Sequence, residues 1–319
     1  MWIAWETQRR SLELARQLGC VLYIIDLSGW LRYPISIFKT ICIFFKNKPK
    51  LLFVQNPSMI LAALSCVYGM ISDTVIIVDR HTTFRLNKPH SGSFRIWLFM
   101  KLHYFTLKRA DLTIVTNDFL AQLVRKAEGR PFVLPDKLPE LTPRQSIKLK
   151  GRINILMISS FGLDEPVYEV IDAIKKLGRD DVYLYITGNY KKLDVNLPTK
   201  TPTNIIFTGF IPEQQFIDML FSVDAVMALT TSDYCMLCGC YEAVSANKPL
   251  ITSDKTVLRE YFNGAVFVDN NSQGIENGFR SVLKNLEKYK SKIIFLRKRL
   301  TLRWDRLYRN LEREILKLS

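Results

Sequence analysis

The sequence contains few of the residues that characterise several protein classes: of its 319 residues, 14 are glycine, 13 proline, six cysteine and three histidine. With 48% hydrophobic residues, this composition excludes a fibrous or disordered chain. Six unevenly spaced cysteines do not suggest a disulfide framework, so we expect a reducing, cytoplasmic environment. The most apolar segments, 35–45 and 57–72, are shorter than a membrane span. We also expect no signal peptide, because charged residues follow Met1 closely.

Three cysteines have the spacing C-x-x-C-x-C, at Cys235, Cys238 and Cys240. A structural zinc ion needs four ligands, and the histidines lie far away in the sequence, at 81, 90 and 103. A redox C-x-x-C belongs to a thioredoxin-like topology, which the surrounding pattern does not suggest. We therefore predict that these thiols are packing residues at a crowded turn, and that the protein binds no metal ion.

Short apolar runs typical of buried parallel strands alternate with helical patterns along most of the chain. A proline-rich stretch at 131–150 interrupts this alternation. The pattern predicts an α/β fold with two doubly wound, Rossmann-like parallel-sheet domains that face a cleft. The predicted boundaries are an N-terminal domain at 1–138, a linker at 139–150, a second domain at 151–283 and a basic helical segment at 284–319.

The net charge of +15 is spread unevenly along the chain. Residues 1–150 carry +12, residues 151–283 carry −5, and residues 284–319 carry +8. This asymmetry predicts that the first and last blocks face a polyanion, either nucleic acid or an anionic membrane surface. Because no nucleic-acid-binding motif is present, we expect a membrane surface and no nucleic acid.

Three short motifs follow one another in the predicted second domain: GFIP at 209–212, EAVS at 242–245 and KPLITS at 248–253. This succession resembles the nucleotide-binding domain of GT-B glycosyltransferases of the family 4-like group 1, over about residues 155–285. The resemblance implies the GT-B fold, in which 1–138 is the acceptor-binding domain and 151–283 the nucleotide-sugar-binding domain. It further implies that the segment at 284–319 is a long C-terminal helix that crosses back and packs on the N-terminal domain. It also implies a UDP- or GDP-sugar as donor and no cofactor.

The segment from 230 to 242 suits a diphosphate on physical grounds as well. A helix that begins between 235 and 239 offers free backbone amides, and Gly239 permits close approach. In the resemblance, Glu242 is the second glutamate of an E-x7-E signature and binds the ribose, while Tyr234 replaces the first glutamate. The predicted nucleotide-sugar residues are Ser160, Phe161, Gly188, Asn189, Gly209, Phe210, Ile211, Thr231, Ser232, Asp233, Tyr234, Met236, Gly239 and Glu242.

In the predicted first domain, QNP at 55–57 and DRH at 79–81 end two successive strands. They resemble a stretch of dolichol-pathway β-1,4-mannosyltransferases and of bacterial exopolysaccharide glycosyltransferases. Polar residues at strand ends face the cleft, so His81 or Asp79 is predicted to be the catalytic base or to orient the acceptor. Arg9, Gln55 and Asn56 are predicted to bind the acceptor. The alternative is structural: Asp79 caps a loop, while His81 and Arg9 are surface residues.

Together these features predict a metal-independent hexosyltransferase that acts on a lipid-linked or polysaccharide acceptor in the biosynthesis of an exopolysaccharide, capsule or glycolipid. The basic blocks predict a peripheral protein on the inner face of the membrane, with other glycan-assembly enzymes as possible partners. One alternative is a catalytically degenerate GT-B subunit of another transferase, which Tyr234 favours, and a second is a basic nucleic-acid-binding protein, which only the net charge of +15 favours. The two resemblances also disagree on stereochemistry: the first implies retention and the second inversion.

Overall fold

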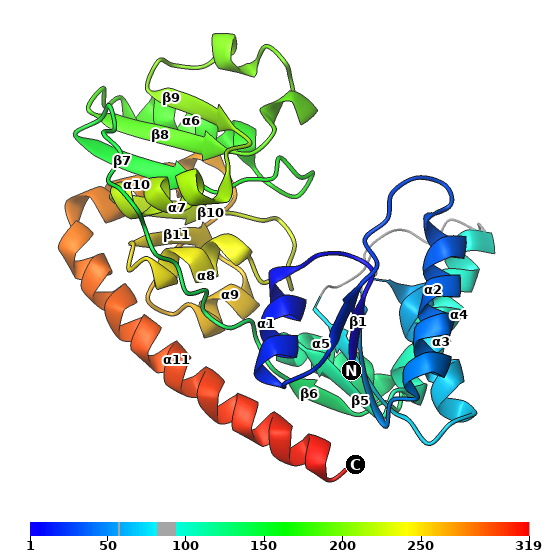
Figure 1. The fold of residues 1–319 in the computed structure, drawn as a ribbon. Helices are drawn as coiled ribbons and strands as arrows, with labels where there is room; N and C mark the ends of the chain where they lie inside the picture. Colours follow the sequence, from blue (N-terminus) through cyan, green and yellow to red (C-terminus); the bar gives the residue numbers. More distant parts are fainter. Residues whose placement is uncertain (57, 82–93, 319) are drawn as a thin grey trace. The chain divides into compact units, whose positions relative to one another are not determined.

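The computed structural model describes residues 1–56, 58–81 and 94–318. The chain forms two compact units, each built around one six-stranded sheet (Figure 1). The first unit comprises Met1–Asp136 and Trp304–Ser319, and the second comprises Lys137–Arg303. All strand pairs in both sheets are parallel. The α/β prediction is confirmed.

The first sheet has the strand order β2-β1-β3-β4-β5-β6. Because β1 lies between β2 and β3, the chain winds first to one side and then to the other, so the topological switch point falls between β1 and β3. The strands are β1 (Trp2–Ala4), β2 (Leu22–Ile24), β3 (Leu51–Asn56), β4 (Val75–Arg80), β5 (Leu112–Val115) and β6 (Pro131–Val133), and the helices are α1 (Arg9–Gln17), α2 (Arg32–Asn47), α3 (Met59–Met70), α4 (Phe94–Arg109) and α5 (Asp118–Lys126).

The second sheet has the strand order β12-β11-β10-β7-β8-β9. Its first strand, β7, lies between β10 and β8, which places the switch point between β7 and β10. The strands are β7 (Ile153–Met157), β8 (Val182–Thr187), β9 (Ile205–Gly209), β10 (Ala225–Ala228), β11 (Leu250–Ser253) and β12 (Val266–Val268). The helices are α6 (Val167–Leu177), α7 (Glu213–Ser222), α8 (Cys238–Ser245), α9 (Thr256–Tyr261), α10 (Ser272–Lys284) and α11 (Leu286–Leu316), with short 3-10 turns at Tyr190–Lys192 and Leu197–Lys200.

Each unit has its own core on both faces of its sheet, as continuous apolar strands require. In the first unit, Trp2 stacks on Phe53 with ring centroids 5.2 Å apart. In the second, Ile155, Met157, Leu184 and Ile186 of the central strands are fully buried.

The long helix α11 belongs to both units. Ile293, Leu296 and Leu300 are buried in the second unit's core, whereas Trp304 and Leu311 are buried in the first. Trp304 also donates a hydrogen bond from its indole N–H to the carbonyl of Pro135 (3.0 Å). The division therefore falls within α11, whereas the sequence analysis placed all of 284–319 against the first domain.

The segment predicted as a linker is attached to the second unit. The backbone N–H of Arg144 donates to Asp218 (2.7 Å), and that of Ile147 donates to Ser222 (2.9 Å), both on α7. None of the described helices is long and apolar enough to cross a membrane.

Candidate active site

The predicted nucleotide-sugar residues gather at the carboxyl edge of the second sheet. The strands are parallel, so the loops that follow β7, β8, β9 and β10 emerge at the same edge. Ser160 and Phe161 follow β7, Gly188 and Asn189 follow β8, Gly209 ends β9 and is followed by Phe210 and Ile211, and the residues from Thr231 to Met236 follow β10. The topology thus brings together segments that are up to about 80 residues apart.

Asp164 joins the two loops that flank the switch point. Its backbone carbonyl accepts from the N–H of Thr231 (2.6 Å), and its carboxylate accepts from the hydroxyls of Thr230 (2.6 Å) and Ser232 (3.3 Å). The sequence analysis did not identify Asp164. Asp164 and Glu165 are adjacent acidic residues in the same turn. Nothing in the sequence indicates that Asp164, rather than Glu165, bonds to the residues that follow β10.

Further hydrogen bonds connect these loops to the ends of β11 and β12. Thr230 donates its N–H to Ser253 (2.9 Å), Ser253 donates its hydroxyl to Asn270 (2.6 Å), and Asn270 donates back to the carbonyl of Thr230 (2.8 Å). Fully bonded buried networks of this kind hold backbone groups in a fixed arrangement. This edge of the sheet is therefore preorganised.

The turn after β7 encloses the carboxylate of Glu165. That carboxylate accepts from the backbone N–H groups of Ser160 (3.0 Å) and Phe161 (3.0 Å), and from the hydroxyls of Ser159 and Ser160. Converging N–H groups and hydroxyls form an anion site. In this structure Glu165 fills it, and the Phe161 side chain is buried in the core at 3% exposure. Ser160 and Phe161, but not Glu165, had been predicted to contact the donor.

Gly188 is required by the packing of this edge. Its φ is +99°, and a Cβ there would lie 2.1 Å from the carbonyl oxygen of Ser159. Gly209 also has a positive φ of +70°, but the space around it is open. The next residue, Phe210, is 91% exposed, so its ring is free to stack on a planar ligand. Asn189 is exposed as well, and Ile211 is half-buried.

Helix α8 begins directly beside the ends of β7 and β10. A Cβ on Gly239 would lie 2.9 Å from the Cβ of Ala228 and 3.2 Å from that of Ile158, so glycine lets the helix start approach the sheet. The first turn of α8 carries no acidic residue, and its N-cap Leu237 provides no side-chain cap. Its amides and the helix dipole therefore favour an anion at this end. Glu242 lies in the next turn and is only 8% exposed.

Two of the three cysteines around this helix start, Cys235 and Cys240, have thiols of low reactivity, whereas Cys238 is exposed. Burial raises the pKa of the Cys240 thiol to about 12, and burial and nearby Asp164 raise that of Cys235. Thiols with raised pKa values are poor nucleophiles. Among the described residues, no group of three or more His, Cys, Asp and Glu side chains is placed to hold a metal ion. Tyr234 and Met236 pack against the second unit's core.

Two lysines lie at this edge, and a third lies elsewhere. Lys255, after β11, forms an ion pair with Asp233 (2.7 Å), and Lys192 donates to the carbonyl of Ser160 (2.8 Å). Lys248 instead donates to the carbonyls of Phe221 (2.7 Å) and Val223 (2.6 Å), which precede β10. Its role is structural, whereas Lys255 and Lys192 are placed to meet an anion.

The first unit has a buried charge cluster at its own switch point. Arg10 Nε donates to both carboxylate oxygens of Asp79 (2.9 and 3.0 Å), and Arg10 Nη1 donates to Asp136 (2.7 Å). Burial alone would raise the pKa of Asp79, but Arg10 and His81 together lower it to about 2. Asp79 is therefore a permanent anion at neutral pH and unsuited to accept a proton as a base.

His81 follows Asp79 at the end of β4, with its side chain 14% exposed. Its Nδ1 lies 3.6 Å from Asp79 Oδ2, beyond hydrogen-bond distance, so the carboxylate acts on the ring through its negative charge, which favours a proton on Nδ1 and leaves Nε2 as an acceptor. Of the two predicted candidates for the base, the geometry favours His81.

The predicted acceptor residues have different environments. Gln55 pairs with Asp79 in the register of β3 and β4, and Asn56 is fully buried. Among the described residues, Gln55 Nε2 and Asn56 Oδ1 are buried without a hydrogen-bond partner. Arg9 is exposed at the start of α1, whereas its neighbour Arg10 holds the cluster. Pro57 of the motif lies outside the described residues.

Two doubly wound parallel sheets, an anion-favouring helix start and a C-terminal helix shared by both units define a GT-B glycosyltransferase fold. Residues 140–298 match the model of glycosyl transferases group 1, and this half of the chain belongs to that family. The predicted family and fold are confirmed.

Solved structures share the fold across the whole chain. Sucrose-phosphate synthase from Thermosynechococcus elongatus is 12% identical with a TM-score of 0.77, covering 100% of this chain and 99% of that one. HepE from Anabaena, in complex with UDP and glucose, is 12% identical with a TM-score of 0.73, covering 99% and 91%. A glycosyltransferase from Rickettsia africae is 14% identical with a TM-score of 0.69, covering 100% and 90%. No curated protein matches the chain in sequence.

Proposed function

We propose that the protein is a hexosyltransferase that moves a sugar from a nucleotide-sugar donor to a lipid-linked or polysaccharide acceptor in surface-glycan biosynthesis. The observation that carries the proposal is the start of α8, where uncapped amides meet the switch point of the second sheet and Glu242 follows in the next turn. The Anabaena HepE structures contain UDP and UDP-glucose, which supports a UDP-sugar as donor.

On this proposal the second unit binds the donor without a metal ion or cofactor. The amides of the first turn of α8 and the ammonium of Lys255 stabilise the diphosphate, including the charge that develops on it as it leaves. Glu242 accepts hydrogen bonds from the ribose hydroxyls, and the exposed ring of Phe210 stacks on the base. Each of these contacts recognises a nucleoside diphosphate and leaves the choice of sugar to other groups.

The first unit provides the base. His81 Nε2 takes the proton of the acceptor hydroxyl, while Asp79 orients the ring and stabilises the imidazolium that forms. The acceptor oxygen then bonds to the anomeric carbon, and the bond from that carbon to the diphosphate breaks. A protein base suits direct displacement with inversion, the outcome implied by the second of the two sequence resemblances. NMR of the product would show a changed anomeric configuration, and a retained one would contradict this role.

Thermal unfolding with added UDP, GDP, UDP-glucose and GDP-mannose tests the donor site. At least one of these ligands should raise the melting temperature, and Glu242→Ala should abolish that shift. The matched control is Glu260→Ala, which removes an exposed carboxylate from α9 and should leave the shift intact. A Glu242→Ala variant that keeps every ligand shift would falsify the assignment.

A second candidate function is that of a partner subunit that has lost transfer activity. Two observations favour it: Glu165 fills the amide site after β7, and Tyr234 stands where the family signature has a glutamate. The two candidate functions are distinguished by whether the protein catalyses sugar transfer. Incubation of the protein with radiolabelled UDP- and GDP-sugars and membrane lipid extracts should yield labelled glycolipid if it is an enzyme. Nucleotide binding without any labelled product or sugar hydrolysis would favour the partner subunit.

We also propose that the protein acts at the inner face of a membrane, alongside other glycan-assembly enzymes, and that it binds no nucleic acid. The support is the excess of positive charge in residues 1–150 and 284–319.

A further inference from the structure

Helix α2 buries two polar side chains and exposes two large aromatic ones. Ser36, Thr40 and Phe44 face the core, and Thr40 accepts a hydrogen bond from the indole N–H of Trp5 (3.0 Å). The opposite stripe carries Phe38 and Phe45, which are 68% and 61% exposed. A helix at the surface of a soluble domain normally has the reverse arrangement.

Large apolar side chains are also exposed on the neighbouring segments. Trp30, just before α2, is 87% exposed, and Ile71, just after α3, is 74% exposed. On α4, Trp97 and Tyr104 are each 55% exposed. Helix α3 packs against both α2 and α4, so the three helices form one layer beside the first sheet (Figure 1). Exposed aromatic side chains in one layer mark an interaction surface.

The charge of this layer has a single sign. Residues 27–72 contain no acidic residue, and neither do residues 80–110. Helix α2 carries Arg32, Lys39 and Lys46, α3 carries no charge, and the charged residues of α4 are all basic. A solvated helical surface normally mixes both signs. Aromatic side chains interspersed with lysine and arginine alone complement an anionic lipid surface.

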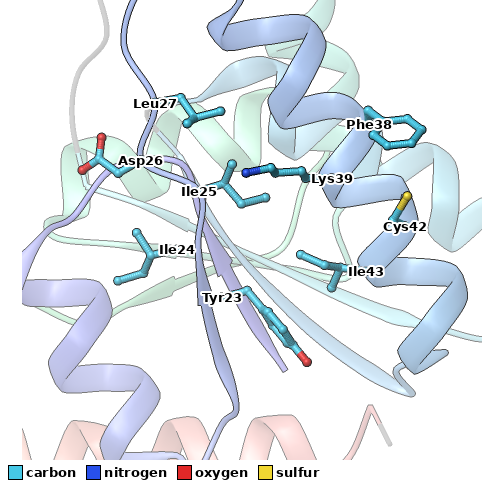
Figure 2. A pocket seen from close by; sticks show the side chains of 9 residues that line it. All are labelled: Tyr23, Ile24, Ile25, Asp26, Leu27, Phe38, Lys39, Cys42 and Ile43. Carbon is cyan, nitrogen blue, oxygen red and sulfur yellow. The ribbon is translucent and has the colours of Figure 1, made fainter.

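A cavity of about 490 Å³ opens beside α2 (Figure 2). Its walls are Ile24, Ile25 and Leu27 on one side and Phe38 and Ile43 on the other. Lys39 reaches from α2 toward Ile25, so an ammonium group stands within apolar walls. Asp26 accepts from the N–H (3.1 Å) and hydroxyl (2.9 Å) of Thr7, which engages that carboxylate. The apolar walls suit a lipid chain and the Lys39 ammonium suits its phosphate, while the carboxylate of Asp26, also in the lining, is held by Thr7.

We propose that α2, with α3 and α4, forms a membrane-docking face for an anionic phospholipid bilayer, and that the cavity beside Phe38 receives a chain of one bilayer lipid whose phosphate meets Lys39. Trp30, Phe38 and Phe45 insert among the headgroups, and Lys39 and Lys46 contact lipid phosphates. The docking face rests on the membrane location proposed above, but it requires neither donor nor turnover, so it can hold or fail independently of the proposed transferase activity.

Vesicle sedimentation of the full chain tests the docking face. Vesicles of phosphatidylcholine with 30% phosphatidylglycerol should bind the protein, pure phosphatidylcholine vesicles should bind it much less, and 0.5 M salt should weaken the binding. Lys39→Gln/Lys46→Gln should lower the partition coefficient about 30-fold. Phe38→Ser/Phe45→Ser should lower it about tenfold or more. Because these side chains are exposed, the variants should keep the wild-type melting temperature.

The matched controls lie on α6 of the second unit. Tyr168→Ser removes an aromatic side chain that is 53% exposed, and Lys175→Gln/Lys176→Gln removes two basic charges. Neither should change vesicle binding more than twofold. Equal losses in the α6 and α2 variants, or equal binding to both kinds of vesicle, would overturn the proposal. So would a lipid-free dimer, seen by analytical ultracentrifugation, that Phe38→Ser/Phe45→Ser dissociates, because the face would then bind a second copy.

Cys42 lines the cavity and is exposed, so it can report on the lipid directly. In a Cys238→Ser background, an environment-sensitive fluorophore on Cys42 should shift its emission to the blue when anionic vesicles are added. An unchanged spectrum under conditions in which the protein sediments with the vesicles would contradict lipid entry into the cavity.

Discussion

Replacing Asp79 by asparagine removes a negative charge from the first unit while preserving the size of the side chain. The carboxylate is fully buried beside the guanidinium of Arg10, whose side chain is only 7% exposed. In the variant, Arg10 would keep a single carboxylate partner, Asp136, which is 27% exposed. Because breaking a buried ion pair leaves an uncompensated charge, we expect the free energy of unfolding to fall by about 3–5 kcal/mol.

The pH dependence of stability gives a second, independent value for the contribution of the ionised Asp79 to the free energy of unfolding. Burial alone would raise the pKa of Asp79, but Arg10 and His81 lower it from 3.8 to about 2. This difference corresponds to about 2.5 kcal/mol of stability. Because the folded pKa lies below the unfolded one, the contribution is fully present above about pH 5 and is lost as the pH falls toward 2. It is smaller than the cost of the substitution, since protonation leaves the wild-type side chain able to hydrogen-bond.

Urea unfolding of wild type, Asp79→Asn, Arg10→Met and the double variant at pH 7 would measure the pair. We expect a coupling energy of at least about 2 kcal/mol. Either single substitution leaves a buried charge without its partner, and the double variant removes that charge as well. Asp254→Asn is the control: it breaks an ion pair with Arg259 whose side chains are 38% and 55% exposed, and should cost no more than about 1 kcal/mol. Additive single costs, or an Asp79→Asn cost as small as that of the control, would refute the reasoning.

Three further substitutions test the second unit. Gly188→Ala should lower the free energy of unfolding by at least about 2 kcal/mol in thermal unfolding. Gly178→Ala is the control, because Gly178 has a positive φ but no close contact, and it should lower that free energy by about 1 kcal/mol. Equal losses would contradict the steric argument. Lys248→Met should cost about 1–3 kcal/mol in urea unfolding, because the carbonyls of Phe221 and Val223 lose their donor, and no loss would show that water replaces it. Glu165→Gln should raise the calorimetric affinity for UDP or GDP about three- to tenfold by removing a like charge, and weaker binding would show that Glu165 instead supports the site.

The strands were predictable because buried parallel strands carry little but Val, Ile, Leu and Phe. The runs KLLFVQN and TVIIVD coincide with β3 and β4 to within a residue or two. Their polar ends, Gln55 and Asp79, were predictable for the same reason, since the change in polarity marks where each strand ends. The parallel topology then sets them side by side.

The partners of the buried charges were not predictable. Nothing local distinguishes Arg9 from Arg10, yet only Arg10 turns inward, because its carboxylate partners lie 69 and 126 residues further along the chain. Similarly, the sequence does not indicate that Glu165 folds back onto the turn that precedes it. Such contacts depend on tertiary packing, which neither periodicity nor composition encodes.

Helix α2 shows a second kind of limit. Its existence follows from the sequence, but an apolar stripe containing Phe38 and Phe45 predicts that this stripe is buried. The structure instead buries Ser36 and Thr40 together with Phe44, and Thr40 accepts a hydrogen bond from the indole N–H of Trp5. The periodicity of the helix sequence does not encode this contact with a residue 35 positions away.

The two candidate anion positions of the second unit are not equivalent. A diphosphate that reached the amides of Ser160 and Phe161 would have to displace the carboxylate of Glu165, and that negative charge would remain nearby. At the start of α8 the first turn has no acidic residue, and Gly239 holds the backbone against the sheet without a side chain in the way. The diphosphate is therefore expected at α8, with Glu165 repelling a second anion from the adjacent turn. If this is correct, Glu165→Gln strengthens diphosphate binding without moving it, and Glu242→Ala remains as damaging in the Glu165→Gln background as in wild type.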